Sequence, residues 1–176
     1  MNVTIFGGAQ PREGSGAYEE ALTLGKLLAQ RGHAVLTGGY AGTMEAVSRG
    51  AAEAGGHVIG VTCEEIEAWR PISANQWVKE ERRKQTLMER LTELIEGCDA
   101  AIALAGGVGT LTEISLTWNL MLVESIPPKP LVVVGAGWKS TFDVFFKEFY
   151  TYMPIRQEEL LYFAADVEEA VEKLEG

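Results

Sequence analysis

Two glycine-rich stretches of the sequence have the residue types and spacing of anion-binding sites. Residues 38–45 read GGYAGTME, and residues 106–113 read GGVGTLTE. In each stretch a short apolar segment is followed by a glycine-rich turn and then by a threonine that opens a predicted helix. Glycines let a ligand approach the backbone closely, and the free N–H groups at a helix start point at a phosphate. The pattern therefore predicts a pocket for a small phosphorylated ligand.

Neither stretch matches the common nucleotide-binding motifs. A P-loop needs a lysine directly after its glycines, and a dinucleotide-binding turn needs the spacing GxGxxG. Both features are missing from residues 38–45 and 106–113. The sequence thus favours a phosphate site of another type.

Thr110 and Glu113 have two competing interpretations. Their spacing is that of a capping box, with Thr110 as the N-cap and Glu113 reaching back to the backbone of Thr110. Local sequence favours this structural role. The alternative is that Glu113 is a catalytic carboxylate beside the glycine-rich turn, and that interpretation depends on a second signal upstream.

The second signal is an arginine on the segment before the predicted fourth strand. The apolar spacing predicts a helix over residues 78–97, with Arg83 and Arg90 close together on one flank of its apolar stripe. We interpret Arg83 as a surface residue whose stem covers apolar neighbours. Arg90 lies nine residues before Asp99, where the chain enters the strand that leads to the second glycine-rich turn.

The elements that must position these residues alternate regularly along the chain. Apolar runs predict strands, helical spacing predicts the helices between them, and glycine pairs follow several strands, including Gly7-Gly8 after the first. The predicted strands are 3–6, 34–37, 57–61, 100–104, 131–134 and 161–164. The predicted helices are 18–30, 43–54, 78–97, 110–123, 140–150 and 167–174.

Nearly continuous apolar strands that alternate with helices indicate a parallel sheet covered on both faces. We therefore expect a Rossmann-like, doubly wound α/β fold in which residues 1–176 form a single domain. Ligands of such sheets bind beyond the carboxyl ends of the strands, where the glycines gather. Residues 63–79 have no clear period, and we expect either a binding loop over that edge or a packed surface excursion.

Composition excludes several classes of function. The net charge is −10, from 25 acidic and 15 basic residues, which disfavours nucleic acid as a partner but leaves room for a small phosphorylated ligand. No apolar run approaches 18 residues and the start of the sequence lacks a basic signal region, so we expect a cytoplasmic protein. Two cysteines and two histidines are too few for a disulfide framework or a zinc centre, and we expect no metal.

Several motifs follow one another in an order that is typical of one family. They are Phe6-Gly7-Gly8, Gly38-Gly39-x-x-Gly42-x-Met44-x-Ala46-Val47, Gly55-Gly56-x-Val58-Ile59-Gly60-Val61, Arg90, Cys98-Asp99-Ala100, Gly106-Gly107-Val108-Gly109-Thr110-x-x-Glu113 and Trp118. With these motifs the chain resembles the Lonely Guy (LOG) family from about residue 3 to 135. That family was long labelled as lysine decarboxylases and includes phosphoribohydrolases that activate cytokinins.

The resemblance implies a homodimeric hydrolase without a cofactor. Its reaction would cleave the N-glycosidic bond of a purine nucleoside 5′-monophosphate, of which cytokinin nucleotides are one kind, to free base and ribose 5-phosphate. It implies that Arg90 and Glu113 are catalytic. The residues implied in phosphate or substrate binding are Gly8, Gly39, Gly42, Thr43, Met44, Gly106, Gly107, Gly109 and Thr110.

The implied chemistry fits these residue types. Breaking a glycosidic bond builds positive charge on the ribose, which a nearby carboxylate stabilises while it orients a water molecule. An arginine beside that carboxylate holds it ionised and correctly aimed. A lysine decarboxylase is excluded, because no lysine is recognisable as the anchor of a pyridoxal phosphate cofactor.

The sequence departs from the family pattern at three positions. Ala105 stands where the family has a proline, Thr112 where it has a second acid, and Leu91 where a lysine follows the arginine. The alternative is a non-catalytic protein that binds a nucleotide or a phosphorylated cofactor, like the molybdenum-cofactor carriers with the same fold and glycine loop. A carrier needs the phosphate cradle but not the Arg/Glu pair. A dimeric sensor domain with the same pocket is a third interpretation.

The predicted helix 110–123 indicates how the chain assembles. It is apolar around most of its circumference, with residues such as Ile114, Trp118 and Val123. A helix that covers one face of a sheet needs a narrower stripe. We therefore expect part of this surface to meet a second copy, in a homodimer or a higher even homo-oligomer. The alternative is a fully buried central helix.

Overall fold

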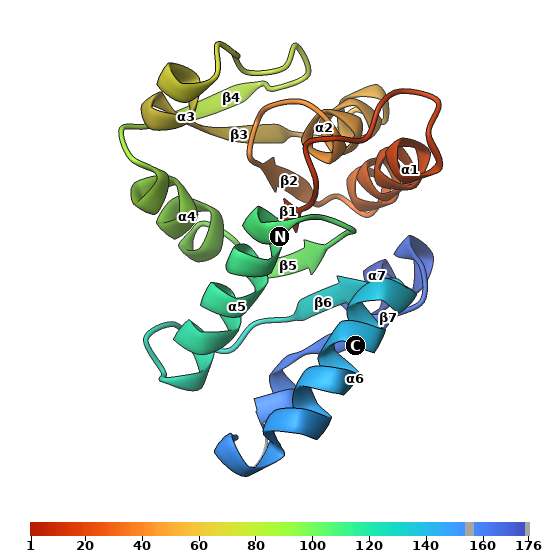
Figure 1. Cartoon of the computed structure of the whole chain (residues 1–176). Helices are drawn as coiled ribbons and strands as arrows, with labels where there is room; N and C mark the ends of the chain where they lie inside the picture. The colour runs from red at the N-terminus through yellow and green to blue at the C-terminus, as the bar shows by residue number, and fades with distance from the viewer. Residues whose placement is uncertain (154–156, 175–176) are drawn as a thin grey trace.

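A computed structural model of the chain describes residues 1–153 and 157–174 as a seven-stranded parallel sheet between two layers of helices (Figure 1). The strand order is β4-β3-β2-β1-β5-β6-β7, and every neighbouring pair is parallel. The strands are β1 (Asn2–Phe6), β2 (Ala34–Thr37), β3 (Val58–Cys63), β4 (Glu80–Lys84), β5 (Ala100–Ala103), β6 (Leu131–Val134) and β7 (Tyr162–Ala164). The predicted Rossmann-like, doubly wound α/β architecture is confirmed.

The helices divide between the two faces of the sheet. One layer contains α1 (Gly16–Gln30), α2 (Thr43–Glu53) and α7 (Val167–Glu172), and the other contains α4 (Leu87–Glu96), α5 (Val108–Leu122) and α6 (Ala136–Phe149). Side chains of β1 alternate between the two cores: Val3 and Ile5 face the first layer and Phe6 faces the second. The described residues also form three short helices: α3 (Glu64–Trp69), η1 (Tyr150–Tyr152) and η2 (Gln157–Leu160).

The order of the strands reverses beside β1. The chain runs outward from β1 to β4 on one side, and then returns to place β5 on the other side of β1. Two strands whose crossovers leave in opposite directions open a crevice beyond their carboxyl ends. The glycine turns after β1 and β5 meet there, since the Gly8 N–H donates to the Ala105 carbonyl at 3.1 Å.

The predicted helix over residues 78–97 is wrong in its first half. Residues 80–84 form β4, an edge strand paired with β3, and α4 begins only at Leu87. Ion pairs between β4 and α4 neutralise this charged strand: Arg82 and Lys84 both contact Glu93, at 2.8 and 2.6 Å. The strand is therefore not held by an apolar face, and hydrophobic spacing could not detect it. Arg83 lies on β4 and not on the helix of Arg90.

The segment 63–79 is only partly the irregular loop that was predicted. It begins with Cys63, the last residue of β3, and continues into α3, and only residues 70–79 have neither helix nor strand. Asn75 fixes its course, because its side-chain amide donates to the carbonyls of Gly39 and Tyr40 at 3.0 and 2.9 Å. None of the helices in the described part of the chain has the length and apolar character needed to cross a membrane.

Candidate active site

A cavity of about 480 Å³ lies at the carboxyl edge of the sheet, where the strand order reverses. The loop after β1, the start of α5, the short helix α3 and the start of α4 all contribute to it. The structure thereby brings Arg90 and Glu113 together with five of the predicted binding residues. These five residues are Gly8, Met44, Gly107, Gly109 and Thr110.

The start of α5 supplies a row of backbone donors to this cavity. The helix begins at Val108 with Gly107 as its N-cap, and no side chain caps it. The N–H groups of the first helical residues, through Thr110, therefore have no partner within the helix. A Cβ atom added at Gly107 or Gly109 would meet no heavy atom within 4 Å, so both glycines border open space.

The capping-box interpretation of Thr110 and Glu113 is wrong. Because α5 begins two residues before Thr110, this threonine lies inside the first turn, 3% exposed, and Glu113 lies in the second turn. Neither residue is at the position that caps a helix. A capping box does occur at the start of α4, where Thr86 accepts from the backbone of Glu89 and the Glu89 carboxylate accepts from the backbone of Thr86.

Four of the predicted binding residues lie outside the lining of the cavity. Gly39, Gly42 and Thr43 are buried beneath it, and Gly106 faces a neighbouring hollow. Thr43 donates its N–H to the carbonyl of Gly8 at 3.0 Å, which supports the loop after β1. Gly42 has φ +73°, and a side chain there would collide with the backbone of Ala9. The contacts of the first glycine-rich stretch therefore hold the β1 loop in place.

Arg90 is a fixed, buried positive charge. Its side chain is 6% exposed, and its Nε donates to the carbonyl of Val61 at 2.8 Å while Nη2 donates to the carbonyl of Gly38 at 3.2 Å. The guanidinium also lies over the ring of Tyr40, 5.7 Å from its centroid. A Cβ at Gly38 would overlap the guanidinium, so glycine is required there. These contacts leave Arg90 one orientation, along the wall of the cavity.

Glu113 has a strongly perturbed acidity. Burial raises the pKa of its carboxyl group to about 7, and the positive charge of Arg90 opposes this rise without cancelling it. No hydrogen bond joins the two side chains among the contacts of the described residues, so the pair interacts through space. Arg90 therefore does not hold Glu113 fully ionised at neutral pH, contrary to the simple expectation. A carboxyl group that titrates near pH 7 is suited to proton transfer.

The cavity has an apolar and aromatic wall that sequence analysis missed. It comes from Ile66 and Trp69 of α3 and from Leu87 and Leu91 of α4, and Arg70 follows directly after α3. The available signal was the irregular segment 63–79 with its two tryptophans, but no spacing in it identified which side chains face the cavity. An apolar wall beside a polar helix start suits a ligand with a planar ring at one end and an anion at the other.

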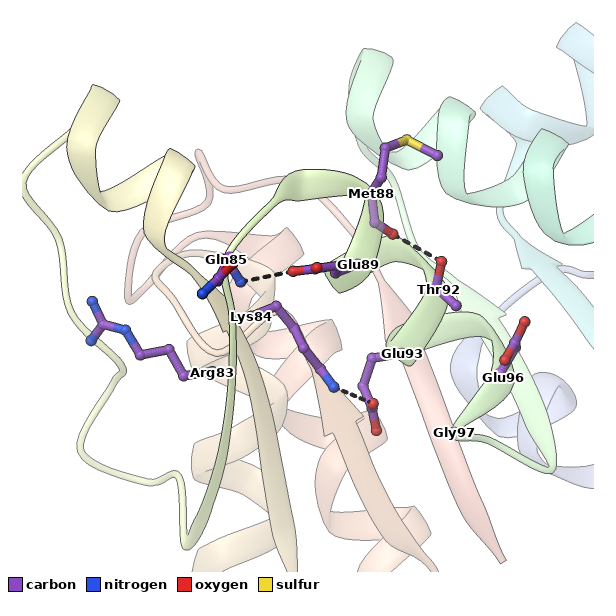
Figure 2. Close-up of a pocket in the computed structure, with 9 residues that line it drawn as sticks. All are labelled: Arg83, Lys84, Gln85, Met88, Glu89, Thr92, Glu93, Glu96 and Gly97. Atoms are coloured by element: carbon purple, nitrogen blue, oxygen red, sulfur yellow. Dashed lines mark hydrogen bonds and ion pairs between the residues drawn. The ribbon is translucent and has the colours of Figure 1, made fainter.

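A larger hollow of about 780 Å³ lies between β4 and α4 and has a different character (Figure 2). Several of its polar groups bind one another. Lys84 contacts Glu93 at 2.6 Å, and the Glu89 carboxylate accepts from the backbone N–H of Gln85 at 3.0 Å. None of the predicted site residues lines this hollow. The described residues also contain no group of three or more histidine, cysteine or acidic side chains that would hold a metal ion.

Comparison with known proteins agrees with this geometry. A family model described as the SLOG cluster4 family matches residues 1–123, which include the glycine turns, Arg90 and Glu113. The chain belongs to this family. The resemblance to LOG proteins is thereby confirmed.

Two kinds of protein among those that resemble this SLOG chain bear on its site. One is the probable cytokinin riboside 5′-monophosphate phosphoribohydrolase LOGL5 of Oryza sativa subsp. japonica, 34% identical over 136 residues, or 76% of this chain and 54% of that protein. The cytokinin riboside 5′-monophosphate phosphoribohydrolase of Rhodococcoides fascians is 33% identical over 129 residues, or 72% of this chain and 65% of that protein. The chain thus spans about half the length of the rice relative.

The second kind is a carrier. The structure of the molybdenum cofactor carrier protein of Chlamydomonas reinhardtii superposes with a TM-score of 0.72 at 25% sequence identity. The superposition covers 98% of this chain and 96% of the carrier. The similarity to the hydrolases therefore covers about three quarters of the SLOG chain, and the similarity to the carrier covers nearly all of it.

Proposed function

We propose that this protein hydrolyses the N-glycosidic bond of purine nucleoside 5′-monophosphates to free base and ribose 5-phosphate. The observation that carries the proposal is the place of Glu113. Its carboxyl group lies beside a buried arginine, in the same cavity as the uncapped start of α5. A protein that only holds a phosphate needs the helix start alone. The hydrolase names of its relatives support the same activity.

The uncapped start of α5 binds the 5′-phosphate in this proposal. The backbone donors of Gly107, Gly109 and Thr110 surround the anion, and the positive end of the helix dipole adds to the attraction. Gly8 and Met44 line the same space. Gly39, Gly42, Thr43 and Gly106 act by shaping the turns on which those donors lie.

Glu113 is the catalytic carboxylate. As the bond between C1′ and the base nitrogen breaks, its electron pair leaves with the base and positive charge develops on the ribose ring. The ionised carboxylate stabilises that charge and accepts a proton from the water that attacks C1′. The departing base takes up a proton in turn. Arg90 lowers the pKa of Glu113 and so increases the fraction that is ionised at neutral pH.

A panel of nucleotides tests the proposal. We expect release of free base from at least one purine 5′-monophosphate and none from the matching nucleoside, because the phosphate supplies much of the binding. Chromatographic measurement of the free base checks both. Equal turnover of a nucleotide and its nucleoside would contradict the assigned role of α5.

A phosphorylated-cofactor carrier is the second candidate. It is favoured by the superposition on the molybdenum cofactor carrier protein, which spans nearly the whole of both chains. Tight binding of a nucleotide or phosphorylated cofactor without release of base from any member of the panel would favour the carrier over the hydrolase.

We also propose a homodimer. Apolar side chains remain exposed just after α5, along α6 and just after α6, at Val123, Val144, Phe149 and Tyr150. The central part of α5 does not contribute, because Ile114 and Trp118 pack into the core. An exposed apolar surface of this kind is typical of a subunit contact.

A hydrolase of nucleoside monophosphates works where these nucleotides are made, so the proposal includes a cytoplasmic location.

A further inference from the structure

Arg70 lines the cavity but has no part in the proposed cleavage step. It follows α3, lines the cavity, and lies beside Trp69, whose side chain is 80% exposed. The Nε of Arg70 is buried and makes no hydrogen bond to any of the described residues. A buried donor without a partner is costly, and a bound ligand that accepts from it removes that cost.

The two arginines of the cavity differ in what they offer a ligand. Arg90 already donates to the carbonyls of Val61 and Gly38. Arg70 has a stacking contact with Trp69, at 5.8 Å from the ring centroid, and that contact leaves its N–H groups available. A guanidinium carries only donors, so a ligand group that meets Arg70 must be an acceptor.

The proposed reaction fixes which part of the substrate meets Arg70. The 5′-phosphate lies at the start of α5 and the ribose lies beside Glu113. The base therefore extends toward the remaining wall, which Ile66, Trp69 and Leu91 make apolar. On the α3 part of that wall, Arg70 is the polar side chain with free donors.

We propose that Arg70 recognises the base and that the cavity prefers 6-oxopurine nucleotides, such as GMP and IMP, over AMP. The edge of a 6-oxopurine presents O6 and N7, two acceptors that match the two parallel N–H groups of a guanidinium. Adenine carries an amino group at position 6, which places a donor against a donor. Trp69 offers its ring as a surface on which the base stacks. This inference rests on the proposed function.

The test compares base release from GMP, IMP and AMP. We expect kcat/KM for GMP to exceed that for AMP by about 10-fold or more, the usual discrimination of one bidentate arginine contact. Arg70→Ala should remove this preference, because kcat/KM for GMP should fall while kcat/KM for AMP should change less than about threefold. Arg70→Lys keeps the charge but not the fork, so it should also lose the preference. Lys26→Ala removes a partly exposed positive charge from α1, outside the cavity, and should change neither value.

Three outcomes would overturn the inference. Wild-type protein that prefers AMP, or treats the bases alike, would leave the hydrolase proposal intact and remove the role of Arg70. An equal loss for all three nucleotides in Arg70→Ala, rescued by Arg70→Lys, would make Arg70 a phosphate contact. If no nucleotide is cleaved, the hydrolase proposal fails, and calorimetric binding of GMP and AMP then decides the preference by itself. Equal affinity for the two, or binding of neither, would refute it.

Discussion

Replacing Glu113 by glutamine should stabilise the protein at alkaline pH and inactivate it. Burial makes the charged form of this carboxyl group costly, and glutamine keeps its shape without the charge. A glutamate that only capped a helix would behave in the opposite way, because its loss at high pH would weaken the cap. The variant therefore separates a catalytic carboxylate from a structural one.

The magnitude follows from the pKa. Burial raises the pKa of Glu113 from an ordinary value of 4.5 to about 7. The folded protein then binds this proton more strongly than the unfolded chain, so the free energy of unfolding falls as pH rises from about 4.5 to 7. Below this window the penalty is absent, and above it the full shift corresponds to about 3 kcal/mol. Because the side chain is partly exposed, about 3 kcal/mol is an upper figure.

Urea unfolding at pH 4, 5.5 and 8 measures this difference. The variant and the wild type should be alike at pH 4, and the variant should gain up to about 3 kcal/mol at pH 8, or roughly 6–12 °C in Tm. Turnover should fall about 100-fold or more, while ligand binding through the backbone of α5 persists. Glu96→Gln, an exposed glutamate at the end of α4, is the matched control and should show no such gain. An active Glu113→Gln protein with an unchanged pH profile of stability would refute the reasoning.

Four further predictions concern the same site and the assembly. The pH profile of kcat/KM should rise through about pH 7 as Glu113 ionises and lose that step in Glu113→Gln; an unchanged profile would contradict the role of its charge. Arg90→Ala should lower the free energy of unfolding in urea by about 2–4 kcal/mol, because two buried carbonyls lose their donor. The double variant Arg90→Ala/Glu113→Gln should lose far less turnover than the product of the two single losses, because the two residues act as one unit. Gly107→Ala should change the free energy of unfolding by less than about 1 kcal/mol yet weaken nucleotide binding. Gly38→Ala should destabilise the fold, because its methyl group overlaps the guanidinium of Arg90. Thermal melts measure the stability of both variants, and calorimetry measures their nucleotide binding. Light scattering at micromolar concentration should give a dimer for the wild type and a monomer for Phe149→Glu, and a monomeric wild type would refute the assembly.

The sequence by itself determined the architecture, because parallel strands buried on both faces must be apolar throughout. The runs at 34–37 and 131–134 match β2 and β6 residue for residue, and the alternation with helices leaves few other arrangements. The same reasoning failed at β4, which has ion pairs to Glu93 in place of an apolar face. Hydrophobic spacing reports burial, so it does not detect a strand held by charges.

The sequence also identified the chemical groups of the site, since glycine turns, Arg90 and Glu113 can be recognised by type and spacing. Their roles depended on the tertiary structure. The exact start of α5 decided that Glu113 is not a cap, and contacts with Val61 and Gly38 decided that Arg90 is buried and fixed. The placement of Arg70 in the same cavity, some forty residues from Glu113 along the chain, was not visible in any local pattern. The raised pKa of Glu113 and the unpaired buried donor of Arg70 both result from burial, and this burial arises only when distant segments pack together.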